Sequence, residues 1–125
     1  MATPIETVTQ FCDQVAGGDA AKAADFFSDD AVYHNIPLDP VTGRDAIRDT
    51  IGMFLGMADK VWFDTLHIVA DGPLVMTERI DHFVMGDRDI ALPVMGAFEV
   101  NADGKITAWR DYFDMNQFTS QMQSG

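Results

Sequence analysis

Three charged side chains, Arg79, Asp81 and Asp111, fall on predicted strands among apolar neighbours. Side chains two apart on a strand share a face, so Arg79 and Asp81 point the same way in the stretch 74–85. On a later predicted strand, the same alternation places Asp111 beside Trp109. Burying charged groups is costly unless they are paired. A bridge from the arginine to both carboxyl groups would satisfy all three.

The net charge of this trio decides which protonation states are favourable. One carboxylate balances the guanidinium, whereas a second ionised carboxylate would leave negative charge in a low-dielectric site. One of the two acids is therefore expected to hold its proton. Two carboxyl groups whose pKa values are pushed apart can serve as acid and base near neutral pH, each role contributing about 10²–10⁴-fold. The trio indicates push-pull proton transfer.

A second polar pair lies on the predicted strand 31–35, where Tyr33 and Asn35 share one face. A tyrosine and an asparagine can hold a water molecule together. If the ionised carboxylate also contacts that water, the water is oriented and deprotonated, and it becomes a nucleophile without metal, cofactor or covalent intermediate. This pattern indicates a hydrolase or a hydratase.

Large apolar side chains share the predicted inner faces with the charges. The predicted substrate-binding walls are Phe83, Met85, Trp109 and Phe113. No metal site is predicted, because the three histidines, His34, His67 and His82, lie on separate strands without a close ligand pair.

The amino-terminal part predicts three helices and one strand. A capping-box pattern at Thr3 and Glu6 begins the first helix, and Gly17 ends it. The further predicted elements are a short helix over 20–27, a strand over 31–35 and a helix whose apolar stripe runs from 47 to 58.

The second half predicts four strands, over 61–70, 74–85, 90–100 and 105–113. Because short turns join them, these strands are expected to be antiparallel. Pro93 and Gly96 interrupt the third of them and indicate a bend. A last helix, which Asp114 and Gln117 could cap, would lie across an open end of the concave face. The predicted class is α+β: a cone-shaped, strongly curved mixed or antiparallel sheet with helices packed over its concave side.

Composition narrows the possible partners. The chain has 125 residues, of which 47% are hydrophobic, and we expect one domain over 1–125. A formal net charge of -12 disfavours nucleic acid and anionic membrane surfaces. With no signal-like start and no apolar stretch near the roughly 20 residues of a membrane span, a cytoplasmic protein is expected. The single cysteine, Cys12, falls on the apolar stripe of the first helix and is expected in the core.

Four stretches, 33–38, 43–46, 77–81 and 104–114, resemble the limonene-1,2-epoxide hydrolases. The resemblance runs from about Ala31 to Phe118, and the combination of Arg-x-Asp with Trp-Arg-Asp-Tyr-Phe-Asp is its most specific part. It implies the cone-shaped fold of the wider superfamily of nuclear transport factor 2, steroid isomerases and SnoaL-like polyketide cyclases, a fold that alone does not define an activity.

The resemblance also implies a role for each polar residue. Asp81 would protonate the epoxide oxygen, Asp111 would take a proton from water, and Arg79 would orient both carboxyl groups. Tyr33 and Asn35 would hold the water. The implied reaction is one-step, cofactor-independent opening of small apolar cyclic or terpenoid epoxides, such as limonene-1,2-epoxide, to vicinal diols.

Two other functions stay open at this point. An isomerase or cyclase of the same fold would need a single carboxylate base and an oxyanion donor. A non-enzymatic ligand-binding or dimerisation domain would line its pocket with apolar residues and avoid buried charge. The outer sheet face, with Leu74, Met76, Ile80 and Val84, is apolar enough to predict a homodimer through sheet packing, which the resemblance implies as well.

Overall fold

The structure is a computed structural model that describes residues 2–123. Its elements, in chain order, are α1 (Pro4–Ala16), α2 (Ala20–Ala24), β1 (Phe27–Asn35), β2 (Val41–Thr42), α3 (Arg44–Met57), β3 (Lys60–Asp71), β4 (Leu74–Met85), β5 (Arg88–Val100), β6 (Ile106–Tyr112) and α4 (Met115–Gln123). Within this part of the chain the strands form a six-stranded sheet in the order β2-β1-β6-β5-β4-β3.

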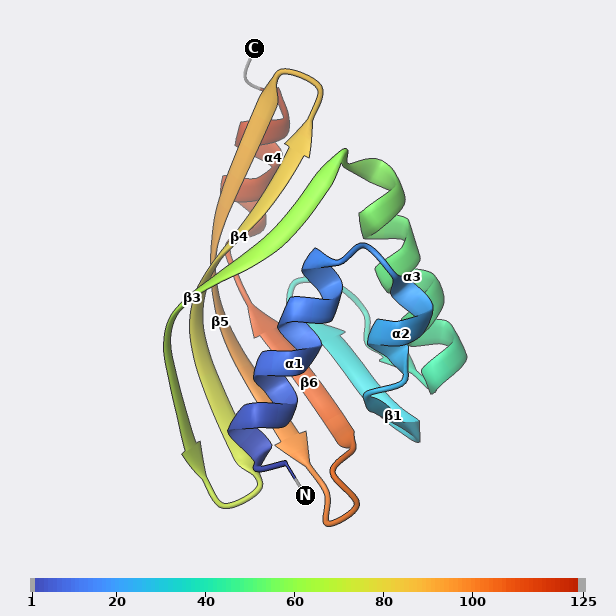
Figure 1. Cartoon of the computed structure of the whole chain (residues 1–125). Helices are drawn as coiled ribbons and strands as arrows, with labels where there is room; N and C mark the ends of the chain where they lie inside the picture. Colours follow the sequence, from blue (N-terminus) through green and yellow to red (C-terminus); the bar gives the residue numbers. More distant parts are fainter. Residues whose placement is uncertain (1, 124–125) are drawn as a thin grey trace.

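The sheet is mixed and strongly curved. Each of the strands β3 to β6 pairs antiparallel with the next one along the chain, as predicted. Strand β1, in contrast, lies parallel to β6. Helices α1, α2 and α3 lie on the concave side, and α4 lies beside β5 near one end of the sheet (Figure 1). The predicted α+β class with a curved, helix-covered sheet is confirmed.

Helix α1 packs against the concave face of the sheet, mainly on β3 (Figure 1). Its capping box forms as predicted: Glu6 N–H donates to Thr3 Oγ1 at 3.2 Å, and Thr3 N–H donates to Glu6 Oε1 at 2.8 Å. Phe11 is fully buried and meets the Trp109 ring edge-on at 4.9 Å between centroids. Cys12 is buried as predicted, and this burial raises the pKa of its thiol to about 12, so it is a neutral core side chain.

Two predicted boundaries are wrong in the amino-terminal part. The second helix ends at Ala24 instead of Phe27, and β1 begins at Phe27, four positions before the predicted Ala31. Phe27 is fully buried, contacts the Phe11 ring and pairs with Ile106 of β6, so packing and strand pairing override the local helical preference. Strand β2 was not predicted, because two residues are too short to carry a pattern.

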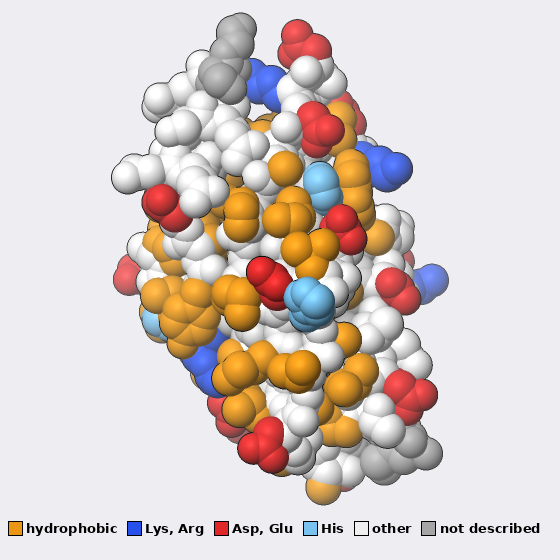
Figure 2. Space-filling view, turned by 90° about the vertical axis from the view of Figure 1, so that its left-hand side faces the viewer, with side chains coloured by type: hydrophobic (Ala, Val, Ile, Leu, Met, Phe, Trp, Pro, Cys, Tyr) orange, Lys and Arg blue, Asp and Glu red, His pale blue; other side chains and the backbone are white. Residues whose placement is uncertain are grey.

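The convex face of the sheet is partly apolar (Figure 2). We call Val69, Met76, Met95 and Tyr112 the outer patch. Their exposed fractions lie between 44% and 61%, and they form adjacent pairs, Val69 with Met76 and Met95 with Tyr112. The other residues predicted for this face, Leu74, Ile80 and Val84, are half-buried. No helix in the described chain has the length and apolar character needed to cross a membrane.

Candidate active site

A cavity lies between the concave face of the sheet and the helices that cover it. The empty space in it, with the open mouth included, is about 810 Å³. Its polar lining consists of Tyr33, Asn35, Asp81 and Asp111. The four predicted wall residues, Phe83, Met85, Trp109 and Phe113, all lie in the lining.

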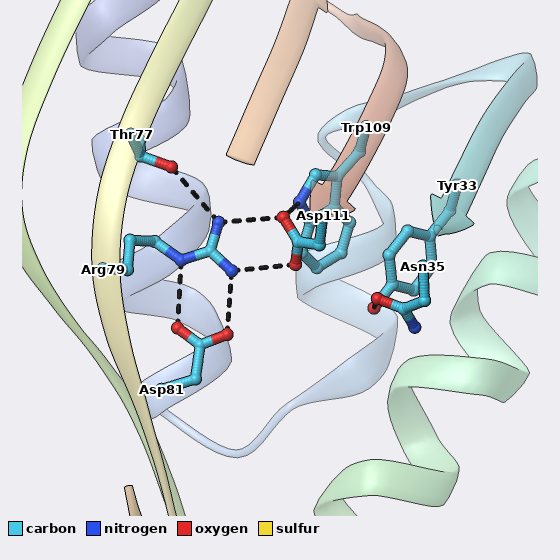
Figure 3. A network of polar contacts seen from close by, with 7 residues as sticks. All are labelled: Tyr33, Asn35, Thr77, Arg79, Asp81, Trp109 and Asp111. Atoms are coloured by element: carbon cyan, nitrogen blue, oxygen red, sulfur yellow. Dashed lines mark hydrogen bonds and ion pairs between the residues drawn. The ribbon is translucent and has the colours of Figure 1, made fainter. Parts of the chain in front are cut away.

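Arg79 sits behind this lining and bridges the two acids (Figure 3). Its guanidinium donates from Nε and Nη2 to the two oxygens of Asp81, at 3.0 and 2.8 Å. It donates from Nη1 and Nη2 to the two oxygens of Asp111, at 3.1 and 2.8 Å. Arg79 is fully buried, and Asp81 and Asp111 are 4% and 3% exposed. The structure therefore brings together the three residues whose pairing the strand alternation predicted.

Strand register explains how Arg79 reaches an acid two strands away. Gly96 of β5 lies between Thr77 of β4 and Asp111 of β6 in one cross-strand row. Strands are spaced about 4.8 Å apart, so Asp111 is roughly 10 Å from the backbone of β4. Because Gly96 has no side chain, the guanidinium can cross β5 at this point.

Trp109 makes the two acids unequal. Its indole Nε1–H donates to Asp111 Oδ1 at 2.7 Å, so Asp111 receives three N–H donors, whereas Asp81 receives two, both from Arg79. Asp111 is therefore the carboxyl group with the larger set of hydrogen-bond donors.

Burial also changes the proton affinity of Asp81. Burial raises the pKa of Asp81 to about 6 from its ordinary 3.8, against the opposing attraction of Arg79, and the nearby charge of Asp111 adds to the rise. Burial by itself lowers the pKa of Arg79, but the two acids together raise it well above its usual range, so the guanidinium stays charged. A raised pKa favours Asp81 as the acid that carries the proton.

Tyr33 and Asn35 lie beside Asp111 because β1 runs parallel to β6, with Tyr33 opposite Trp109 and Asn35 opposite Asp111. The Tyr33 hydroxyl donates to Asn35 Oδ1 at 3.1 Å (Figure 3). Its ring stacks on Trp109 at 4.0 Å between centroids. Burial, with the charge of Asp111, raises the pKa of Tyr33 well above its usual range, so the phenol stays neutral.

Several residues of the site were not predicted from the sequence. The Phe63 ring covers the Arg79 guanidinium at 4.6 Å from its centroid and also lines the cavity. Leu38, Phe54, Met57 and Phe118 are also part of the apolar wall. The helical stripe that contains Phe54 was a usable signal, whereas the placement of Phe63 depends on pairing between β3 and β4.

The polar set fits proton transfer to and from a small molecule. It comprises two carboxyl groups with different surroundings, a neutral phenol and a carboxamide, all facing one apolar cavity. Within residues 2–123 no group of three or more His, Cys, Asp or Glu side chains is arranged to hold a metal ion.

Comparison with known proteins identifies relatives of this chain. The family model described as the limonene-1,2-epoxide hydrolase catalytic domain matches residues 2–124. Epoxide hydrolase EphG of Mycobacterium tuberculosis is 42% identical over 89 residues, which is 70% of this chain. The match covers 57% of that relative's length.

Solved structures extend the comparison to the fold. An LEH-like epoxide hydrolase from M. tuberculosis superposes with a TM-score of 0.80 at 32% identity, covering 94% of this chain and 87% of that one. SalBIII, an epoxide hydrolase/cyclase-like enzyme with a role in pyran ring formation in the polyether salinomycin, superposes with a TM-score of 0.82 at 20% identity, covering 91% and 92%. At that identity the second match shows only that the fold is shared.

Proposed function

The chain belongs to the limonene-1,2-epoxide hydrolase family, and from this premise we propose that it hydrolyses epoxides to vicinal diols. The observation that carries the proposal is the buried Asp81–Arg79–Asp111 bridge, with both carboxyl groups facing an apolar cavity. A cavity for simple ligand binding has no need of two acids held at the cost of burial.

Water activation is assigned to the β1 and β6 side of the cavity. Since the Tyr33 hydroxyl donates to Asn35 Oδ1, the phenol oxygen can accept a hydrogen bond from one water proton, and the Asn35 amide can donate a hydrogen bond to the water oxygen. Asp111 then accepts the other water proton as general base. A water held by three groups is oriented before it attacks.

Ring opening is assigned to the β4 side. Asp81, in its protonated form, gives its proton to the epoxide oxygen while the water oxygen attacks an epoxide carbon and the carbon–oxygen bond breaks. Asp111 takes the proton that the water loses, so the two acids exchange roles in one step. Release of a proton from Asp111 and uptake of one by Asp81 restore the starting state. Arg79 stays charged and holds both carboxyl groups in place.

The substrate class follows from the lining. Apart from the four polar side chains, the walls are aliphatic, thioether and aromatic groups. A substrate with further polar groups would lose hydration without compensation. We therefore assign small apolar cyclic or terpenoid epoxides, such as limonene-1,2-epoxide, as substrates.

The test is diol formation in ¹⁸O-water from limonene-1,2-epoxide and cyclohexene oxide. Asp81→Asn and Asp111→Asn should each lower kcat by about 10²-fold or more, the usual contribution of a general acid or base. Asp64→Asn on the exposed part of β3 is the matched control and should keep wild-type turnover.

The isotope distinguishes the mechanisms. In a single turnover, one-step attack by water puts the label directly into the diol, whereas label found first in a carboxyl group would mean a covalent ester. Absence of diol from a broad epoxide panel would overturn the hydrolase assignment. Conversion of a hydroxy-epoxide to a cyclic ether, with no diol, would favour a cyclase of the same fold.

The chain is further proposed to form a homodimer through the outer patch, since its two exposed apolar pairs lie on four neighbouring strands of the convex face. A cytoplasmic location is proposed as well. It fits the single buried Cys12, which has no internal partner for a disulfide.

A further inference from the structure

Arg79 has five N–H groups, and each of them has an acceptor. Four go to the carboxyl groups of Asp81 and Asp111, and the fifth goes from Nη1 to the hydroxyl of Thr77 at 3.3 Å. We propose that Thr77 is a positioning residue, whose hydroxyl holds the guanidinium in the rotation that pairs it with both carboxyl groups at once. The inference concerns the same site and rests on the proposed epoxide hydrolysis.

Because Thr77 is buried, water from the solvent cannot replace its hydroxyl as an acceptor for Arg79. Thr77 is 1% exposed and lies on the inner face of β4, two residues before Arg79. Without the hydroxyl, one N–H of a buried cation would lack a partner, which is costly. Nη1 would then be drawn toward Asp111 Oδ1, its other acceptor, and the Nε contact with Asp81 would lengthen.

Gly96, which pairs with Thr77 from the neighbouring strand β5, supports a positioning role for the Thr77 hydroxyl. A Cβ atom at this position would lie 2.5 Å from Arg79 Nη1, 2.7 Å from Thr77 Oγ1 and 2.9 Å from Asp111 Oδ1. The Gly96 backbone does not have the positive φ that favours glycine, so the requirement is one of space. The three atoms converge in the volume that a side chain would fill, as expected of a built hydrogen-bond network.

A positioning role differs from a general packing role in its kinetic consequence. Thr77 and Arg79 are absent from the lining of the cavity in the described chain, whereas the two acids they orient are part of it. Loss of the hydroxyl should therefore misalign the acid and the base without changing the apolar surface that binds substrate. The effect is expected in kcat and not in KM.

The experiment is a graded series at Thr77, with cyclohexene oxide as the substrate. Thr77→Ser keeps the acceptor, Thr77→Cys replaces it with a poor acceptor of similar size, and Thr77→Val removes it at nearly constant volume. We expect kcat to fall about tenfold in the valine variant and by an intermediate amount in the cysteine variant, with KM within about twofold. The serine variant should retain kcat within about twofold of wild type. Thr107→Val, which removes a strand hydroxyl bonded to the Glu99 carbonyl, is the matched control and should leave kcat unchanged.

A second readout does not depend on activity. In ¹⁵N-arginine-labelled protein, a guanidinium held at five N–H groups should rotate slowly and give separate Nη signals for Arg79. Thr77→Val should merge or broaden the Nη1 signals, and Thr77→Ser should keep them. If wild type hydrolyses no epoxide, the proposed function fails and these signals still decide the role of Thr77. Wild-type kcat and unchanged Arg79 signals in folded Thr77→Val, or a serine variant as impaired as the valine variant, would overturn the inference.

Discussion

One arginine between two acids leaves a residual negative charge when both acids are ionised, and that charge sits where water is scarce. Burial and the nearby charge of Asp111 raise the pKa of Asp81 to about 6. The same carboxyl group is the proposed proton donor. Activity and stability should therefore both depend on pH through this residue.

For activity, kcat/KM should fall as pH rises through about 6, because the proposed acid loses its proton. Above that pH the decline should approach about tenfold per unit. The measurement is a pH profile of diol formation, corrected for uncatalysed epoxide hydrolysis. A kcat/KM that stays flat or rises from pH 6 to pH 8 would contradict the assignment of Asp81 as the acid.

For stability, the sign follows from the same shift. Between the ordinary pKa of 3.8 and the folded value of about 6, the folded chain holds a proton that the unfolded chain releases. This contribution to stability is complete below pH 3.8 and is lost as pH rises through about 6. Asp81→Asn should thus lose less stability than wild type over that window, measured as the difference in Tm between the two proteins at each pH.

The indole N–H of Trp109 is expected to support Asp111 as the proposed base. Trp109→Phe keeps an aromatic ring against Tyr33 but removes the 2.7 Å bond to Asp111 Oδ1. We expect kcat to fall about tenfold, since a hydrogen bond to a charged group contributes about 1.5–3 kcal/mol. Trp62→Phe is the control, because Trp62 stacks on His82 and is absent from the cavity lining within residues 2–123. Full kcat in Trp109→Phe would contradict a role for the indole N–H.

The sequence was sufficient to predict which charged residues share the inner face, since side-chain alternation along a strand is fixed by backbone geometry. It was insufficient for the groups that set the acids apart. The bond from Trp109 to Asp111, the acceptor at Thr77 and the ring of Phe63 depend on rotamers and on register between strands. These details are properties of the assembled sheet.

Helix α4 closes one part of the cavity although it packs only loosely against the sheet. None of its residues is buried, yet Phe118 lines the cavity and meets the Phe83 ring at 6.2 Å between centroids. Gln121 holds the helix in place: its Oε1 accepts from Ala91 N–H at 2.8 Å, and its Nε2 donates to Ala91 O at 2.9 Å. Strand β6 ends at Tyr112, which pairs with Met95 of β5. Ala91 lies beyond this pair, so its backbone groups bond to Gln121 in place of a neighbouring strand.

Gln121→Glu should loosen this attachment, because a carboxylate can accept from Ala91 N–H but cannot donate to Ala91 O. We expect KM for an apolar epoxide to rise about threefold or more, with a smaller change in kcat, since the acids lie on other elements. Gln117→Glu, an exposed position on the same helix, controls for the added charge. Equal KM values in the two variants would show that the contact with Ala91 does not position α4.

Prediction of the elements themselves succeeded where long patterns exist. The limits of β4 match those predicted, because an uninterrupted alternation runs between two turns. The start of β1 was wrong, since Phe27 joins the sheet through contacts with Phe11 and Ile106 that local sequence does not encode. The parallel placement of β1 against β6 is also non-local, and it is what brings Asn35 beside Asp111.

Apolar attraction and charge repulsion have opposite effects on the proposed dimer. The outer patch offers an apolar surface, with Met76 44% and Met95 51% exposed. Each chain also carries a formal net charge of -12, so two chains repel each other at long range. Screening over about 8–10 Å at physiological ionic strength weakens this repulsion, whereas apolar contact persists in salt.

Association should therefore become stronger as salt is added, the reverse of a dimer held by ion pairs. The measurement is sedimentation equilibrium of the wild-type chain between low and moderate salt, with Met76→Glu/Met95→Glu as the disrupting variant. This pair adds charge at the centre of the outer patch and should shift the chain to monomer. Met53→Glu/Met57→Glu on α3 adds the same charge at two exposed methionines that lie away from the outer patch, and it should leave the dimer intact. A dimer that survives the first pair of substitutions would place the interface elsewhere on the molecule.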